Sequence, residues 1–216
     1  MYQRAEQLIE KILHDGAGDS SVRLLKEFFD GYPVENLRRL LYSADARVVK
    51  VGAWIASELG ATAAPLLDAF ATLLNHPARY VRFFILDAIL VCATDKNGDL
   101  LARALLLLRD FDAAVRWKAL TFAAKASVAQ LAASAQKQVD AQLCSLTLWL
   151  AQLENSNESA ARLTAMLNSD VGIERLIAAA GALRLHSHNP YLLTLASESC
   201  DSDVASFAAE YLEILG

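Results

Sequence analysis

The chain has 216 residues, of which 55% are apolar and 21% are charged. That apolar content is enough to build the core of a globular protein, so intrinsic disorder is excluded. Lys and Arg total 20 against 25 Asp and Glu, which gives a formal net charge of −5. The general attraction of a basic protein to nucleic acid is therefore missing.

The N-terminal region is predicted to begin the fold with two helices, at about residues 3–14 and 20–30. Charges interrupt Met1–His14 at helical spacing, whereas a secretory signal needs an unbroken apolar stretch. The longest charge-free stretch, Ala141–Leu153, is shorter than the roughly 18 to 20 residues that cross a bilayer. Three separated cysteines cannot form a closed set of disulfides. We expect a cytoplasmic protein with no membrane span.

The rest of the chain is rich in Ala and Leu and lacks β-branched alternation, which predicts an all-α fold. An internal repeat is visible within it. Ser43–Ala56 aligns with Asn75–Ala88 at an offset of 32 residues, and both contain Ala-Arg-x-Val followed by Lys or Arg. Further copies, with room for a degenerate sixth between positions 116 and 175, are Asp110–Leu120, Asp170–Ala178 and Asp201–Gly216.

Each copy combines a polar turn with an apolar helix, and an amphipathic segment precedes it. The preceding segments are Val34–Tyr42, Ala63–Leu74, Leu100–Leu108, Ser159–Leu167 and Tyr191–Ser199. This order predicts a series of helical hairpins. An Asp stands where the second helix needs an N-cap, because its carboxylate can accept hydrogen bonds from free backbone amides. The predicted caps are Asp45, Asp112, Asp170 and Asp201.

The Asp turn, the Val-Arg pair and the Ala/Leu spacing resemble HEAT-type helical repeats. The resemblance covers residues 34–216 and implies one α-solenoid domain over 1–216, an α-α superhelix of five to six units, with residues 1–33 as an N-terminal helical cap. It also implies a ladder of Asp and basic side chains between successive units, which should fail at the last repeat because Ser206 replaces the basic residue. The basic rungs would be Lys50, Arg82, Arg116 and Arg175.

In HEAT-like proteins the second helices line a concave surface on which partners bind. Helical spacing places Arg47, Lys50 and Trp54 on one face of such a helix. Trp and Arg contribute disproportionately to protein interfaces. The predicted partner-binding residues are Arg47, Lys50, Trp54, Arg79, Arg82 and Leu86. The alternative for Trp54 is burial against the neighbouring unit, and we expect Trp117 and Trp149 in the core.

Motifs for catalysis, cofactors and metals are weak. Neither a dinucleotide fingerprint nor a P-loop is present. His186 and His188 lack further metal ligands close in sequence, and Asp95–Asp99 lacks the Gly and bidentate Glu of a calcium loop. We therefore expect a protein that is not an enzyme and that has no cofactor, no metal and no catalytic residues.

These observations favour a non-enzymatic protein-binding scaffold, such as a bacterial adaptor or an immunity protein that neutralises its partner. The net negative charge of the chain suits a basic toxin or enzyme as the partner. The charge is uneven, with 4 basic and 10 acidic side chains in residues 131–216, a polarity suited to steering a mixed-charge partner. One alternative is a HEAT-like DNA alkylpurine glycosylase using Asp87 beside the basic stripe, although an acidic chain lacks the counterion-release contribution to DNA affinity. Another is a lyase- or chaperone-type accessory protein that handles a small ligand.

Overall fold

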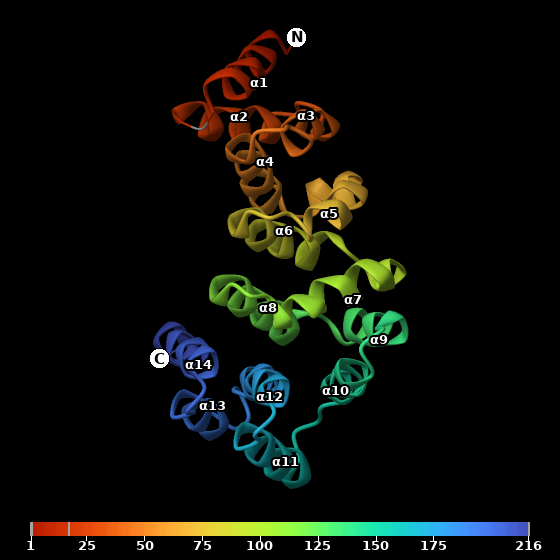
Figure 1. The fold of residues 1–216 in the computed structure, drawn as a ribbon, viewed down its shortest axis with the longest axis vertical. Helices are drawn as coiled ribbons and strands as arrows, with labels where there is room; N and C mark the ends of the chain where they lie inside the picture. The colour runs from red at the N-terminus through yellow and green to blue at the C-terminus, as the bar shows by residue number, and fades with distance from the viewer. Residues whose placement is uncertain (1, 17, 216) are drawn as a thin grey trace. The chain divides into compact units, whose positions relative to one another are not determined.

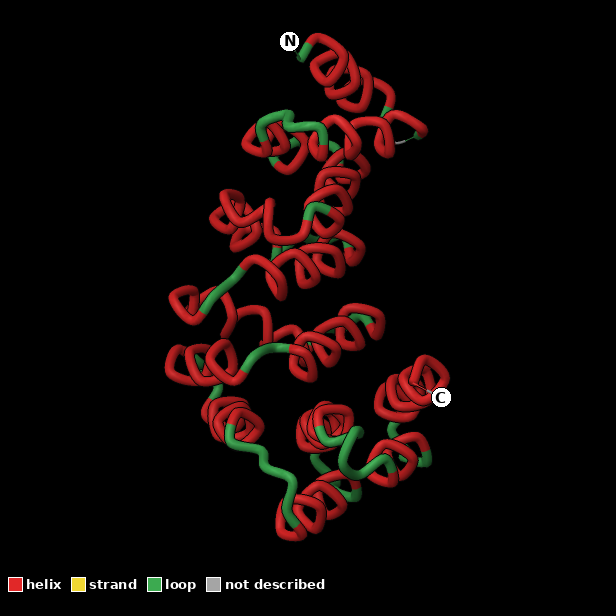
Figure 2. Tube along the Cα trace, turned by 180° about the vertical axis from the view of Figure 1, so that it is seen from behind, coloured by secondary structure: helices red, strands yellow, loops and turns green. Residues whose placement is uncertain are grey.

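The computed structural model describes residues 2–16 and 18–215, and over these residues the chain is all-helical (Figure 1). Fourteen α-helices and four short 3₁₀ helices are joined by short loops, and no strand occurs in the described ranges (Figure 2). None of the described helices has both the length and the apolar character needed to span a membrane. The chain forms two compact units, Met1–Ala93 and Thr94–Gly216, called here the N-terminal and C-terminal units.

The N-terminal unit is a stack of three hairpins that pack in chain order. The two helices expected at about 3–14 and 20–30 form its first hairpin. The second helix of the next hairpin, α4, packs against both α2 and α6. The elements are α1 (Gln3–Asp15), α2 (Asp19–Phe29), η1 (Val34–Leu37), α3 (Arg38–Leu41), α4 (Ala46–Glu58), η2 (Gly60–Leu66), α5 (Leu67–Leu73) and α6 (Arg79–Cys92).

The C-terminal unit contains four hairpins. Its second hairpin is the repeat for which the sequence left room between positions 116 and 175. The elements are η3 (Asp95–Asn97), α7 (Gly98–Leu106), η4 (Leu107–Arg109), α8 (Ala113–Lys125), α9 (Val128–Lys137), α10 (Ala141–Ala151), α11 (Asn157–Leu167), α12 (Gly172–Arg184), α13 (Tyr191–Ser197) and α14 (Ser202–Leu215).

Helix α8 does not follow the chain order of its unit. Its most extensive helix partner is α12, and it also packs against α14, so these contacts pass over the hairpin of α9 and α10. The Arg184 guanidinium, at the end of α12, donates hydrogen bonds to the carbonyl oxygens of Ala124 (3.0 Å) and Ala126 (2.7 Å). These carbonyls lie at the C-terminal end of α8, where helical partners are missing. Arg184 therefore fastens α12 to α8.

The repeat seen in the sequence corresponds to a repeated side-chain contact. Arg82, Arg116 and Arg175 each donate from Nη1 to the carbonyl oxygen six residues earlier, in the turn before their own helix. The three distances are 2.7, 2.8 and 2.7 Å. Each Arg is the fourth residue of its helix, in α6, α8 and α12 respectively. The Arg thus marks equivalent positions of three hairpins, and in two of them, at Arg82 and Arg116, it follows a Val.

The predicted N-caps are confirmed at three of the four positions. Asp45 accepts from the Arg47 amide at 2.8 Å, Asp112 from the Ala114 amide at 3.0 Å, and Asp201 from the Asp203 amide at 3.1 Å. The prediction for Asp170 was wrong, because α12 begins after Val171 with no side-chain cap. The alignment placed the helix start of this looser copy one residue too early.

Close approach within hairpins depends on two glycines. A Cβ on Gly52 of α4 would lie 3.0 Å from the Leu40 Cβ and 3.2 Å from the Leu41 backbone nitrogen. A Cβ on Gly181 of α12 would lie 2.7 Å from the Leu163 Cδ2. Both glycines therefore allow the first helix of the hairpin to pack closely on the second.

The expected ladder of Asp and basic side chains is present only in part. Arg175 donates from Nη2 to the Asp201 carboxylate of the following hairpin at 2.8 Å. Arg116 instead reaches Asp203, 87 residues along the chain, at 2.6 Å. Lys50, a third expected rung, has its ammonium over the ring of Tyr80. Two of the expected basic rungs thus end on carboxylates of the same last hairpin.

Candidate functional site: a cationic and aromatic surface on the N-terminal unit

Two cations of the N-terminal unit gather around one exposed aromatic ring. The Lys50 Nζ lies 4.5 Å from the centroid of the Tyr80 ring, and the Arg79 guanidinium carbon lies 4.7 Å from it. Arg79 also donates from Nη2 to the Tyr80 hydroxyl at 2.8 Å. A cation over an aromatic face contributes about 0.5–1 kcal/mol at an exposed site. Tyr80 is 45% exposed, so this cluster is available to a partner.

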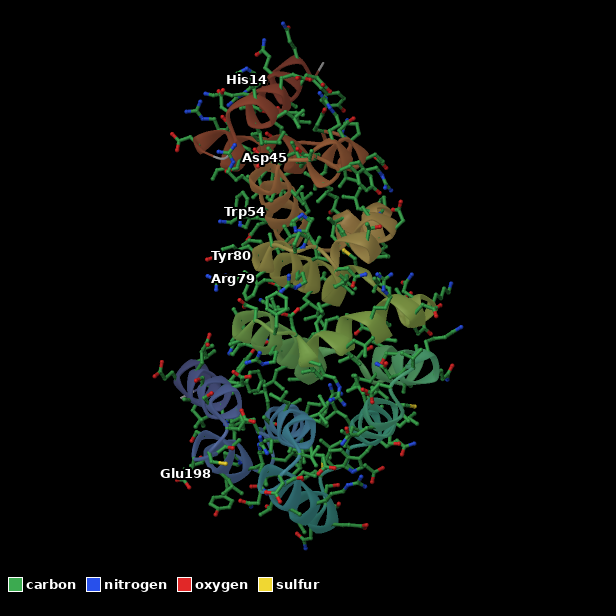
Figure 3. All side chains as sticks on the ribbon, viewed as in Figure 1. His14, Asp45, Trp54, Arg79, Tyr80 and Glu198 are labelled. Carbon is green, nitrogen blue, oxygen red and sulfur yellow. The ribbon has the colours of Figure 1, made fainter. Side chains whose placement is uncertain are left out.

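An apolar hollow lies beside the cluster. It has a volume of about 240 Å³ and is lined by Ser21, Lys50, Val51, Trp54 and Phe84, from α2, α4 and α6. Trp54 is half-buried, so neither of the two expectations for it, full exposure or burial against a neighbour, describes it completely. Trp54, Tyr80 and Arg79 lie along the same side of the unit (Figure 3).

Arg47 extends this face at the start of α4. Its side chain is 78% exposed and pairs with the Asp45 carboxylate, with the Nη2 to Oδ2 distance at 2.7 Å. The hydrogen bonds from the Arg47 side chain and from its backbone amide lower the pKa of Asp45. The same pair raises the pKa of Arg47. We call the set Arg47, Lys50, Trp54, Arg79, Tyr80 and Phe84 the α4/α6 surface.

The two other predicted binding residues lie beneath this surface. Arg82 is 3% exposed and donates to the carbonyl oxygens of His76 and Pro77, and Leu86 is fully buried. Arg82 therefore holds the turn before α6, and Leu86 belongs to the core. Both side chains are therefore buried within the fold.

The register of the helices explains this difference. Arg82 is the fourth residue of α6, whereas Lys50 is the fifth residue of α4. One residue turns a side chain by about 100° around the helix axis. Lys50 therefore points along the surface toward Tyr80, while Arg82 points back into its own turn.

Tyr80 and Phe84 were missed by the sequence reasoning. They lie four residues apart on α6 and so share a face of that helix. Counting from the first residue of each helix, rather than from the shared sequence motif, pairs Tyr80 with Arg47 and would have found Tyr80, whereas Phe84 pairs with the buried Val51. The offset is then 33 residues, from Ala46 to Arg79.

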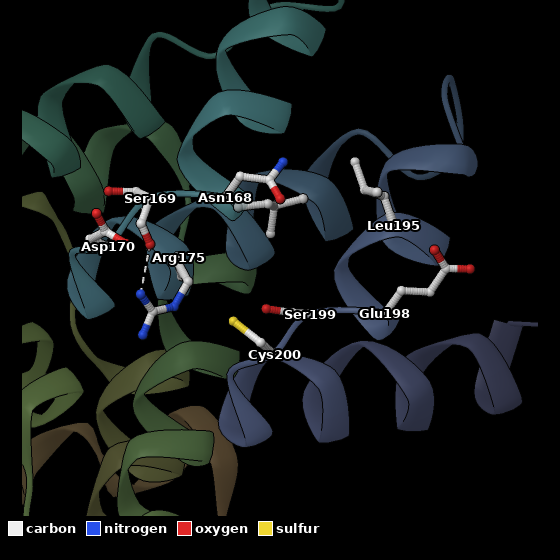
Figure 4. Close-up of a pocket in the computed structure, with 9 residues that line it drawn as sticks. Asn168, Ser169, Asp170, Arg175, Leu195, Glu198, Ser199 and Cys200 are labelled. Atoms are coloured by element: carbon white, nitrogen blue, oxygen red, sulfur yellow. Dashed lines mark hydrogen bonds between the residues drawn. The ribbon is translucent and has the colours of Figure 1, made fainter.

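The C-terminal unit has a larger, polar hollow of about 340 Å³ (Figure 4). It lies between the turns at 168–171 and 198–200 and includes the exposed Cys200. Its cation, Arg175, is engaged by the Ser169 carbonyl at 2.7 Å and by Asp201. This hollow is a hydrogen-bonded junction of two turns, which the Arg175 guanidinium holds together.

The other two tryptophans, expected in the core, are half-buried in the C-terminal unit. Trp117 packs with Phe207 and Tyr211, at centroid distances of 6.2 and 6.4 Å. The Arg162 guanidinium carbon lies 4.7 Å from the centroid of the Trp149 ring. Trp149 is thus an aromatic of similar burial to Trp54, with a cation beside it, in the other unit.

The described residues contain no group of three or more His, Cys, Asp or Glu side chains placed to hold a metal ion. No protein-family model matches the chain, and a comparison with curated proteins finds no similar sequence. The class that the fold defines is an all-helical protein of hairpins packed mostly on their neighbours.

Proposed function

We propose that this chain is a HEAT-like α-solenoid that binds another protein through the α4/α6 surface of its N-terminal unit. The observation that carries the proposal is the exposed Tyr80 ring with Lys50 and Arg79 around it, beside the hollow at Trp54. Aromatic and Arg side chains around an apolar pocket are the usual composition of an interface centre. The role is that of a non-enzymatic scaffold or adaptor.

The three free cysteines are consistent with the cytoplasmic location that belongs to this proposal. Burial raises the pKa of the Cys92 thiol to about 11. Its Sγ lies 3.1 Å from the Gly60 carbonyl oxygen, as expected of a thiol that packs as a small apolar side chain.

A second candidate is an immunity protein that neutralises a basic toxin. It is favoured by the surplus of acidic side chains in residues 131–216, within the C-terminal unit. Such a partner would contact the acidic side chains of that unit. Co-expression with the product of a neighbouring toxin gene tests it: rescue of growth supports neutralisation, and continued toxicity contradicts it.

The main proposal is tested by affinity purification of the full chain from native cells, followed by mass spectrometry. The wild type is compared with Trp54→Ala, Arg79→Glu and the matched control Trp149→Ala. We expect one stoichiometric protein partner that the wild type and the control retain and that both surface variants lose. The melting temperatures of Trp54→Ala and Arg79→Glu should stay within a few degrees of wild type, because single surface changes cost little.

Retention of the same partner by both surface variants would contradict the assignment of the surface. A large fall in melting temperature for Trp54→Ala would instead show that this ring stabilises the core. Base release from alkylated DNA by the purified chain would favour the glycosylase alternative, and a coloured purified sample would favour ligand handling.

A further inference from the structure

The hollow at Trp54 has a composition that restricts what can fill it. Val51, Trp54 and Phe84 supply apolar walls, and Lys50 is the one titratable group among its lining residues in the described part of the chain. An occupant therefore needs an apolar group for the hollow and a negative charge for its edge.

The cation at this edge is not neutralised within the chain. No carboxylate of residues 2–16 or 18–215 lies within ion-pair distance of Lys50, whose contact is the Tyr80 ring. Several other cations of the unit, though not all, are paired: Arg38 with Asp68 at 2.7 Å, Arg39 with Glu6 at 2.6 Å, and Arg47 with Asp45. Lys50 is thus an exposed positive charge, with Arg79 beyond the same ring.

Acidic side chains stand farther along the same two helices. Glu58 is exposed one turn beyond Trp54 on α4, and Asp87 is half-buried one turn beyond Phe84 on α6. Neither lines the hollow. The local charge at the hollow is therefore positive, although the N-terminal unit carries 10 basic and 11 acidic residues in all.

The volume of the hollow favours a single side chain, rather than a whole small-molecule ligand, as its occupant. Small-molecule sites enclose about 300 to 1,000 Å³ and bury most of the ligand. At about 240 Å³, this hollow is below that range, yet many times the roughly 30 Å³ share of one water in the liquid. It fits a single Leu, Ile, Met or Phe side chain presented by a larger molecule.

From these observations, and resting on the proposed function, we infer that the occupant is a short acidic segment of a partner protein. One large apolar side chain of the segment fills the hollow between Trp54 and Phe84, and Asp or Glu side chains next to it pair with Lys50 and approach Arg79. This charge preference is opposite to that of a basic toxin, which would have to bind elsewhere on the chain.

Selection from a random 16-residue peptide library displayed on yeast, with the purified full chain as bait, tests the inference. We expect the enriched peptides to carry Asp or Glu within about three residues of Leu, Ile, Met or Phe. Synthetic versions should lose at least tenfold in affinity to Lys50→Glu and to Trp54→Ala, measured by fluorescence anisotropy at 50 mM salt. Lys125→Glu is the matched control, because the Lys125 Nζ lies 5.2 Å from the centroid of the Tyr211 ring in the other unit.

The inference of an acidic segment would be overturned if the enriched peptides were basic or uncharged. It would also be overturned if acidic peptides bound Lys50→Glu as tightly as the wild type. If those peptides nevertheless lost affinity for Trp54→Ala, the proposed function would still hold, because the peptides would bind at the α4/α6 surface. Absence of any enrichment would overturn the claim of a linear segment, whereas the proposed function is judged by the native partner. A 20-nucleotide oligothymidylate that binds more tightly than the peptides would overturn both, because its anionic backbone and stacking bases suit cations and aromatics.

Discussion

The two units use the same hairpin in different ways. In the N-terminal unit α4 lies between α2 and α6, and each hairpin packs on the next. In the C-terminal unit α8 is fastened to α12 and α14 by Arg184 and by the pair of Arg116 and Asp203. The repeat pattern thus fixes the hairpin and its turn, whereas a few long-range side chains fix which hairpins become neighbours. The N-terminal unit keeps Lys50 beside the exposed Tyr80 ring, whereas in the C-terminal unit Arg116, Arg184 and the aromatic cluster at Trp117 join α8 to α12 and α14.

The largest expected effect is the loss of the aromatic contact between α8 and α14. Phe207 is fully buried and packs on Trp117 and Tyr211, so Phe207→Ala should cost about 3–5 kcal/mol in the free energy of unfolding. Urea unfolding measures the cost. Hydrogen exchange should then rise in both α8 and α14.

The matched control is Phe70→Ala, which removes a fully buried Phe of the N-terminal unit. Its cost should be similar, and the increased exchange should appear in α5 and α6. If Phe207→Ala raises exchange in α13 and α14 while α8 stays protected, the contact of α14 with α8 does not hold this unit together.

The next effect concerns the hydrogen bonds from α12 to the end of α8. Arg184→Leu leaves the carbonyl oxygens of Ala124 and Ala126 without their charged donor, and we expect a loss of about 2–3 kcal/mol. Arg184→Lys should lose less, because a cation near a helix C-terminus is still favourable. Unfolding in guanidinium chloride measures both variants, and equal losses would contradict the role assigned to the cation.

A smaller effect on stability distinguishes Asp45, which caps its helix, from Asp170, which was predicted to cap a helix but does not. Asp45→Ala removes the acceptor for the Arg47 amide and should lower the melting temperature measurably. Asp170→Ala should change stability by only a few tenths of a kcal/mol, because its carboxylate caps no helix. Thermal unfolding of the two variants side by side checks this, and equal losses would restore Asp170 as a cap.

The last effect, at Tyr32 in the N-terminal unit, is a change of stability with pH that appears only in alkaline solution. Burial, with a hydrogen bond to Glu6, raises the pKa of Tyr32 to about 12. Because this pKa lies above the ordinary value of 10, the stabilisation is complete below about pH 10 and is lost as the pH rises toward 12. Tyr32→Phe cannot ionise, so the stability difference between wild type and variant should shrink over that interval. Thermal unfolding between pH 8 and pH 11.5 measures it, and a constant difference would contradict the assignment.

Features that depend on residues close together in the chain could be predicted from the sequence, whereas contacts between residues far apart in the chain could not. The all-helical fold, the hairpins and the caps at Asp45 and Asp112 depend on residues close in the chain, and sequence reasoning predicted them. The partner of α8 depends on Arg116 and Asp203, which are 87 residues apart. Helix α8 also buries side chains all round, from Val115 to Ala124, so its apolar pattern singles out no partner.

The candidate site was predicted in part for a related reason. Of the predicted binding residues, Arg47, Lys50 and Arg79 are exposed and Trp54 is half-buried, and α4 has the predicted start. With the helix starts aligned, Arg47, Lys50 and Trp54 correspond to Tyr80, Phe83 and Asp87, so the one-residue shift in the start of α6 accounts for Tyr80 but not for Phe84. Sequence similarity aligned the motif, while the helix start decides which side chains face outward.

The central claim, that the α4/α6 surface is where a partner binds, is tested most directly by photo-crosslinking in native cells. The photo-reactive residue p-benzoylphenylalanine replaces Tyr80 in one variant and Tyr191 in another, since both side chains are exposed but lie in different units. We predict that position 80 gives a single crosslinked protein, whose attachment site mass spectrometry maps to an acidic segment. Crosslinking from position 191 but not from position 80 would contradict the account.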